Sequence, residues 1–160
     1  MKNDIDGDSF DLSRNEKAFH TAQYFTVPQA TTVAFQFITG DREVLLLHWE
    51  LVALTQTCRF TSREAPTVTD GTVAITPVNI NRSFSTTPTM TLYSNPTGIS
   101  GGTVLTDAAI PSGGNKTGGG ASNTVFWTMK PNTKYTVQVQ NLGNSDTACT
   151  FELAWVELGP

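Results

Sequence analysis

KYTVQVQN, residues 134 to 141, and ACTFELAWVEL, residues 148 to 158, alternate apolar and polar side chains along their length. A period of two is typical of a β-strand that buries one of its faces. We therefore predict two strands, each with one face in a hydrophobic core. The apolar face of the first would hold Tyr135, Val137 and Val139, and that of the second Phe151, Leu153 and Trp155, with Glu157 in the same register.

Two earlier stretches extend this pattern. TTVAFQFIT (31–39) places Val33, Phe35 and Phe37 on one face and ends at a Gly-Asp turn signal. EVLLLHWELVAL (43–54) is apolar on both faces at its start, as expected of a central strand covered on both sides. A helix is the alternative for this second stretch, because Leu, Glu and Trp tolerate helix well. We prefer a strand because the connection is short and the surrounding sequence is β-rich.

The rest of the chain continues as short β-like segments separated by turn residues. We expect eight or nine strands and no long amphipathic helix, which indicates an antiparallel sandwich or barrel. The fold class that we predict is all-β, an antiparallel β-sandwich with a jelly roll as first choice. The further segments are CRFTSRE (58–64), TVAIT (72–76), TMTLYS (89–94), TVLTDAAI (103–110) and NTVFWTMK (123–130).

The first nineteen residues are polar and acidic, with apolar residues only at a few points. We predict that residues 1–19 form an extended arm that docks on another surface through Phe10, Leu12 and Phe19, and that residues 20–160 form a single β-sandwich domain.

Composition and charge exclude several classes of partner. The net charge is −4 and charged residues make up 15% of the chain, so there is no basic surface for nucleic acid. The start of the chain lacks the apolar core of a signal peptide and the longest aliphatic run, VLLL, is too short to span a bilayer. We expect synthesis in a cytoplasm, and two free thiols, Cys58 and Cys149, packed in strands.

The stretch GGNKTGGG (113–120) resembles a phosphate-binding loop only superficially. That loop needs a glycine directly before the lysine and a helix after it, but Asn115 precedes Lys116 and GGGASNTVFW follows. We interpret it as a hairpin tip. Asp4, Asp6 and Asp8 have the alternate spacing of calcium ligands, but neither the glycine nor the twelfth-position glutamate of an EF-hand is in place. No metal or cofactor is expected.

The residues available for catalysis are few. The chain has two histidines, His20 and His48, and no nucleophile-elbow or zinc-protease motif. A glycosidase would need two facing carboxylates, and the sequence leaves open Glu50 with Glu152 or with Glu157. We do not expect an enzyme.

Two features instead favour binding. NINRSFST (79–86) places Arg82 in an Asn-rich loop between strands, where its guanidinium can bind carbonyl groups of a loop or a neighbouring subunit. Aromatic residues combined with few charges suit protein interfaces, and they also suit a platform on which sugars stack.

Several segments in this order resemble virion structural proteins of tailed bacteriophages, of the kind that decorate or cement the head. They are FQFITGDREVLLLHWELVA (35–53), the run from EAPTVTDGT to SGGTVL (64–105), the glycine-rich stretch, and VFWTMKPNTKYTVQVQNLGNSDTACTFELAWVEL (125–158). The shared elements are an E-x-PTVTDGT turn, an N-x-NR loop, a Y-x-NPT-x-x-x-GGT turn and a K-PNT-x-Y strand start.

The resemblance implies a jelly-roll-like sandwich that oligomerises, as a homodimer or homotrimer, on a capsid or another part of the particle. It carries no catalytic residues. Its expected partner is the major capsid protein, with the arm residues Phe10, Leu12 and Phe19 and the loop residue Arg82 in contact. The rival function is a carbohydrate-binding, lectin-like module of a phage tail or fibre, with Trp127 or Tyr93 as its aromatic platform.

Overall fold

The computed structural model describes residues 16–118 and 127–159, and the regular structure of these residues is entirely β. No helix among them is long and apolar enough to cross a bilayer. The strands are β1 (Ala18–Val27), β2 (Thr32–Ile38), β3 (Val44–Ala53), β4 (Cys58–Glu64), β5 (Thr67–Thr69), β6 (Val73–Ile75), β7 (Val78–Asn79), β8 (Thr91–Ser94), β9 (Thr97–Ser100), β10 (Thr103–Ile110), β11 (Asn115–Gly118), β12 (Trp127–Met129), β13 (Lys134–Asn141) and β14 (Thr147–Glu157).

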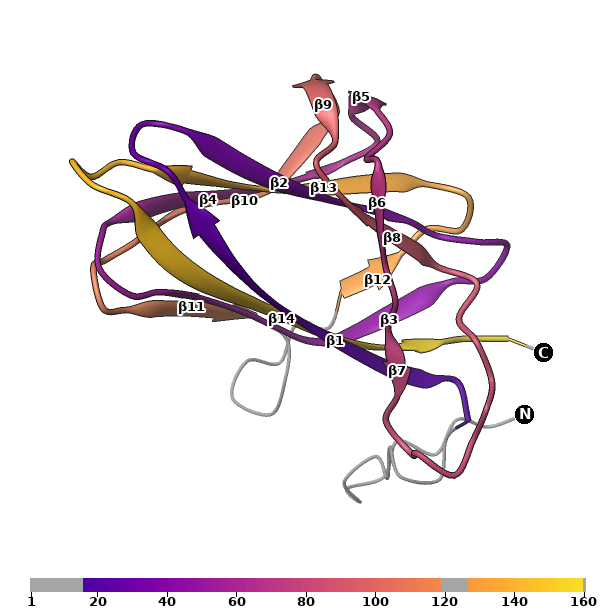
Figure 1. The fold of residues 1–160 in the computed structure, drawn as a ribbon. Coiled ribbons are helices and arrows are strands. Elements are labelled where there is room, and N and C mark those ends of the chain that lie inside the picture. Colours follow the sequence, from indigo (N-terminus) through magenta and orange to yellow (C-terminus); the bar gives the residue numbers. More distant parts are fainter. Residues whose placement is uncertain (1–15, 119–126, 160) are drawn as a thin grey trace.

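Two antiparallel sheets face each other and confirm the predicted β-sandwich (Figure 1). The first sheet has the order β11-β3-β14-β1-β7, with β12 also pairing to β3. The second sheet has the order β10-β4-β13-β2-β8-β6. A separate ribbon of β5 and β9 projects from the second sheet.

The path of the chain alternates between these two sheets. β1 leads into β2, β3 into β4, β10 into β11 and β13 into β14, so each of these pairs connects the first and second sheets. Within the sheets the corresponding strands are neighbours in the same order, β1-β14-β3-β11 above β2-β13-β4-β10. We infer from this connectivity a jelly-roll arrangement, to which the β5–β9 ribbon is an insertion.

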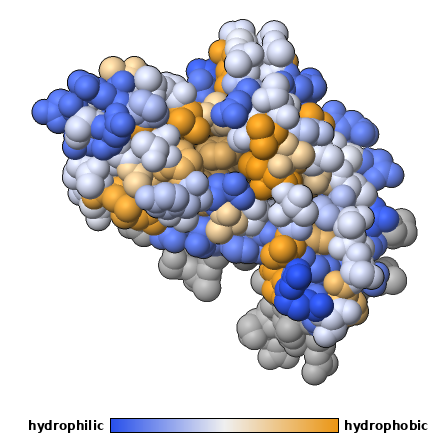
Figure 2. Space-filling model, viewed as in Figure 1, coloured by the Kyte–Doolittle hydropathy of each residue, from blue (hydrophilic) through white to orange (hydrophobic). Residues whose placement is uncertain are grey.

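The core lies between the sheets and includes the residues that the alternation predicted to point inward. Phe35 stacks on Phe151 across the sandwich with ring centroids 5.8 Å apart, and Trp49 stacks on Phe60 at 4.6 Å. Tyr135, Val137, Val139, Leu153, Trp155 and Glu157 are all buried, as expected from the last two strands. Figure 2 shows hydrophobic residues in the recess between the two sheets on one side of the molecule, with hydrophilic residues around its ends.

The boundary that we placed after residue 19 is wrong, because β1 begins at Ala18. Phe19 is 1% exposed, and its ring lies 5.7 Å from that of Trp155 in the core. It therefore belongs to the sandwich and is not available as a contact residue of an arm. The sequence AFHTAQYFTV alternates weakly, since Thr21 and Gln23 occupy inward positions, and this strand was missed.

Residues 43–54 form a strand, as we preferred, and a β-bulge interrupts the alternation near their start. Ala154 of β14 pairs with His48, whereas the next residue, Trp155, pairs with Leu46, so that Leu47 is an extra residue in β3. The bulge changes which residues face inward. Trp49 and Leu51 point into the core on one side of it, and Leu46 does so on the other.

The hairpin-tip interpretation of residues 113–120 is also wrong for its middle part. Residues 115–118 form the edge strand β11, in which Asn115 pairs with Val52 and Gly118 with Trp49 of β3. Gly113 supplies a positive φ of 70° in the turn before it. Gly119 and Gly120 lie outside the described residues. A strand rather than a helix follows the Asn-Lys pair, which removes the geometry of a phosphate-binding loop.

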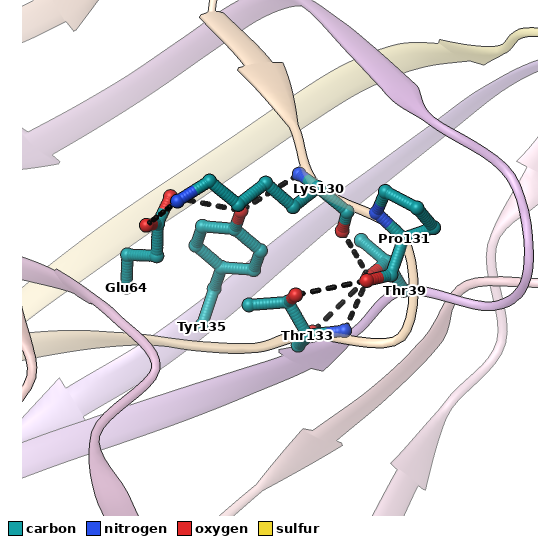
Figure 3. A network of polar contacts seen from close by, with 6 residues as sticks. All are labelled: Thr39, Glu64, Lys130, Pro131, Thr133 and Tyr135. Carbon is teal, nitrogen blue, oxygen red and sulfur yellow. Dashed lines mark hydrogen bonds and ion pairs between the residues drawn. The ribbon is translucent and has the colours of Figure 1, made fainter.

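The K-PNT-x-Y motif forms the turn between β12 and β13 (Figure 3). The hydroxyl of Thr39 donates to the carbonyl of Lys130 at 2.6 Å and accepts from the amide of Thr133 at 2.9 Å. The Tyr135 hydroxyl accepts from the amide of Lys130 at 2.8 Å and donates to Glu64, the first residue of the E-x-PTVTDGT motif. Lys130 Nζ also donates to Glu64 at 2.6 Å, which lowers the pKa of that carboxyl. The two motifs therefore hold each other in place.

The two cysteines are free and buried within strands, as predicted. Cys58 begins β4 in the second sheet and Cys149 lies on β14 in the first, and the Cys58 thiol donates a weak hydrogen bond to the carbonyl of Gln56 at 3.7 Å. Burial raises the pKa of Cys149 to about 12 and also raises the pKa of Cys58. Both groups are therefore neutral thiols at physiological pH.

Candidate interaction surface

The outward-facing side chains of β1, β14 and β3 form a continuous surface that we call the first outer face. Strand register places them in parallel rows, because Ala22 lies opposite Glu152 and Glu152 opposite Glu50, while Tyr24 lies opposite Thr150 and Thr150 opposite Val52. The face consists of His20, Ala22, Tyr24, Thr26, Ala148, Thr150, Glu152, Ala154, His48, Glu50 and Val52.

This face has few charges and exposes apolar side chains. Glu50 and Glu152 are its only carboxylates, and the positions just named include no lysine or arginine. Tyr24 is 73% exposed near the centre of β1, Val78 extends the row of His20 on β7, and Leu54 lies just beyond the end of β3. A charge-depleted surface with an exposed aromatic residue has the composition of an interface core.

Arg82 lies in a rigid turn next to the same sheet. The buried side chain of Asn79 accepts a hydrogen bond from the amide of Asn81, and the side chain of Asn81 accepts one from the amide of Ser83. The amide of Ile80 donates to the carbonyl of Ala18, which ties the turn to β1. Arg82 itself is exposed, and within the described part of the chain its guanidinium makes no hydrogen bond or ion pair. The turn thus presents a pre-positioned cation to solvent.

The carboxylates that the sequence left open as a catalytic pair have separate roles. Glu50 and Glu152 are direct cross-strand partners and half-buried on the first outer face, so this pair does meet, but on the face of a sheet and not in a cleft. Glu157 points inward instead, and its oxygens accept from the amides of Thr89 and Met90 and from the hydroxyl of Thr89 at 2.8–3.0 Å. It anchors the segment that connects the two sheets.

A largely apolar pocket lies between the sheets, where β12 faces β4 and β10. The volume of this cavity is about 70 Å³. Trp127 is 36% exposed at this pocket, with Arg63 and Glu64 also in its lining. A space of this size is well below the several hundred cubic ångströms of typical ligand pockets, so a sugar ring would have to rest on Trp127 from outside.

The two aromatic residues proposed as a sugar platform are not brought together. Trp127 belongs to β12 of the first sheet and Tyr93 to β8 of the second. Tyr93 is half-buried beneath the turn at Gly71, where an added Cβ would lie 2.7 Å from the Cβ of Tyr93. Only Trp127 remains as a candidate platform.

The remaining contact residues fall into two groups. Phe10 and Leu12 lie outside the described residues. Tyr24 and Leu54 were missed by the sequence analysis because β1 was not recognised and because an exposed leucine at the end of a strand cannot be told from a buried one. The alternation of β1 alone would have placed Tyr24 on the solvent side.

No protein-family model, curated protein or solved structure matches this chain.

Proposed function

We propose that this chain is a non-enzymatic structural protein of a tailed-bacteriophage particle, a capsid decoration or cement protein that binds between major capsid subunits and stabilises the head. The observation that carries the proposal is the first outer face, a charge-poor sheet surface with Tyr24 73% exposed on β1 along one side of it. It is assembled in the cytoplasm of the host bacterium and resides on the capsid surface.

The size of the face indicates which other parts must contribute. Four rows of side chains on three strands cover roughly 24 Å by 14 Å, or about 340 Å². A stable interface buries about 800 Å² on each partner. The strands alone are therefore too small, and the proposed contact extends to Arg82 on its turn and to Phe10 and Leu12 before β1. A homodimer or homotrimer would present several such faces to the capsid at once.

The test is co-sedimentation of the full chain with capsids assembled from the major capsid protein of the virus that encodes it. We expect Tyr24→Asp to weaken binding at least tenfold, because the change removes the exposed aromatic ring and buries a charge in the contact. Arg82→Ala should weaken it less. The matched control is Gln140→Asp on the outer side of β13. The proposal would be refuted if the wild-type chain did not bind capsids, or if Tyr24→Asp bound them as tightly as wild type.

A carbohydrate-binding module of a tail or fibre is the second candidate, because Trp127 is partly exposed beside Arg63 and Glu64. An aromatic ring with polar groups at its edge can stack a sugar and bind its hydroxyls. Glycan-array binding that is lost in Trp127→Ala and kept in Tyr24→Asp would favour this function over decoration.

A further inference from the structure

The centre of the first outer face brings together three side chains that can bind a metal ion. His48 and Glu50 are two residues apart on β3 and therefore point to the same side, and Glu152 of β14 lies directly opposite Glu50. One ligand atom from each residue lies within 4.8 Å of the other two, and all three side chains are half-buried. They come from adjacent central strands of the sheet, so their backbone positions are fixed.

The distances are close to those of a bound ion. Ligand atoms lie about 2.0–2.2 Å from Zn²⁺, so two of them on one ion are at most about 4.4 Å apart. The observed separation therefore requires movement of a few tenths of an ångström to about one ångström, which side-chain rotation supplies without any change in the strands.

The surroundings favour occupation by a cation. Like charges directly opposite each other in an antiparallel pair are destabilising, and Glu50 and Glu152 are such a pair. Glu152 and His48 make no hydrogen bond or ion pair with another residue that the structure describes. The cross-strand neighbours on β1 and β14 are Ala22 and Ala154, which are too small to block access and carry no charge.

We propose that His48, Glu50 and Glu152 form a binding site for one divalent transition-metal ion, with Zn²⁺ preferred over Mg²⁺ and Ca²⁺. An imidazole nitrogen suits Zn²⁺, whereas Mg²⁺ and Ca²⁺ prefer sites made of oxygen alone. Three protein ligands leave a further position for water. This site differs from the sequence-based expectation of no metal, because His48 and Glu152 are far apart in the sequence and only the strand register joins them.

The test is calorimetric titration of ZnCl₂ into the full chain after treatment with a chelator. We expect one ion per chain and a rise in Tm with Zn²⁺, with at least tenfold weaker binding of MgCl₂ and CaCl₂. His48→Ala and Glu152→Gln should each weaken Zn²⁺ binding at least tenfold. The matched control is His20→Ala, which removes an imidazole from the same face but outside the site. Titration with CoCl₂ gives a second readout, since the visible absorption of bound Co²⁺ should vanish in His48→Ala.

Circular dichroism without metal establishes that the variants are folded, and we expect it to be unchanged because the three side chains lie outside the core. Absence of Zn²⁺ binding by the wild-type chain would overturn the proposal. So would binding that persists in both His48→Ala and Glu152→Gln, since the ion would then be held elsewhere, for example by the acidic residues at the N-terminus.

Discussion

The outer sides of the two sheets differ in whether their charged side chains form ion pairs within the chain. On the second sheet, Arg59 forms a bidentate ion pair with Asp107 at 2.8 and 2.6 Å, and Lys134 forms an ion pair with Asp70 at 2.6 Å. Gln36 of this side is fully buried and bonded to Asp70 and to the amide of Gly71. The first outer face has two facing glutamates, two histidines and an exposed tyrosine instead.

This difference indicates which side of the molecule would gain more interactions from an outside partner. The charged groups just named on the second outer side are paired with one another, so a partner would gain little from them. The first outer face has apolar and ionisable groups that are better satisfied by something outside the chain, a protein surface or a metal ion. We therefore propose that the two sides of one sandwich have different roles, the second structural and the first for binding.

The largest expected effect separates two glutamates of β14. Glu157→Gln should lower the free energy of unfolding by about 3 kcal/mol, because the inward carboxylate accepts charge-assisted hydrogen bonds from two backbone amides that an amide group cannot fully replace. Glu152→Gln on the first outer face should change it by less than about 0.5 kcal/mol. Urea denaturation of both variants measures the contrast, and equal losses would show that Glu152 is structural.

The next effect contrasts two glutamines on the outer side of the second sheet. Gln36→Ala should cost about 2 kcal/mol, since it leaves Asp70 and the amide of Gly71 without their buried partner. Gln138→Ala, on the same side but only half-buried, should be nearly neutral. Thermal unfolding distinguishes them. A neutral Gln36→Ala would mean that the turn at Asp70 does not depend on this contact.

A smaller effect concerns pH and the inner side of the second sheet. Burial raises the pKa of Tyr135 to about 12, and the neighbouring Glu64 carboxylate adds to the rise. The unfolded chain loses this proton near pH 10, so it binds fewer protons than the folded chain between pH 10 and 12, and stability falls as pH rises through that range.

At pH 11 the ionisation linked to Tyr135 should lower the free energy of unfolding by roughly 1 kcal/mol. Urea unfolding of wild type and Tyr135→Phe at pH 8 and pH 11 isolates it, because other groups titrate equally in both proteins. We expect the variant to lose less stability between the two pH values. If both proteins lost the same stability between pH 8 and pH 11, the loss would come from the ionisation of groups other than Tyr135.

The smallest effect is that of the Arg59–Asp107 pair. Both side chains are largely exposed, at 52% and 42%, so a double-mutant cycle with Arg59→Ala and Asp107→Ala should give only a small favourable coupling that weakens with added salt. The Arg59 guanidinium lowers the pKa of Asp107, so the coupling should also disappear as the carboxylate is protonated in acid. Coupling that is insensitive to both salt and acid would contradict an ionic origin.

Much of the fold could be predicted from the sequence, but little of the candidate binding surface could. Strict alternation placed β13 at its observed ends, because a half-buried strand must repeat every two residues, and the turn residues before TVLTDAAI helped to place β10. It failed for β1, whose inward positions include Thr21 and Gln23, and it could not reveal the bulge at Leu47, which depends on the pairing with β14. The motifs that suggested a family, such as K-PNT-x-Y, prove to be turn-forming contacts.

Residues that meet across strands were out of reach for the same reason. Glu50 was paired with either Glu152 or Glu157, and only the register shows that Glu152 is its neighbour while Glu157 points inward. Arg82 was identified correctly as a loop residue, but the paired asparagine turns that hold it rigid became visible only in the structure.

The most direct test of the division between the two sides is hydroxyl-radical footprinting of the full chain, free and bound to capsids. We predict that oxidation of Tyr24 and Leu54 falls on binding, while that of Val104, exposed on the outer side of the second sheet, is unchanged. Protection of Val104 with Tyr24 still fully reactive would contradict this division, because the binding surface would then lie on the side that we propose is structural.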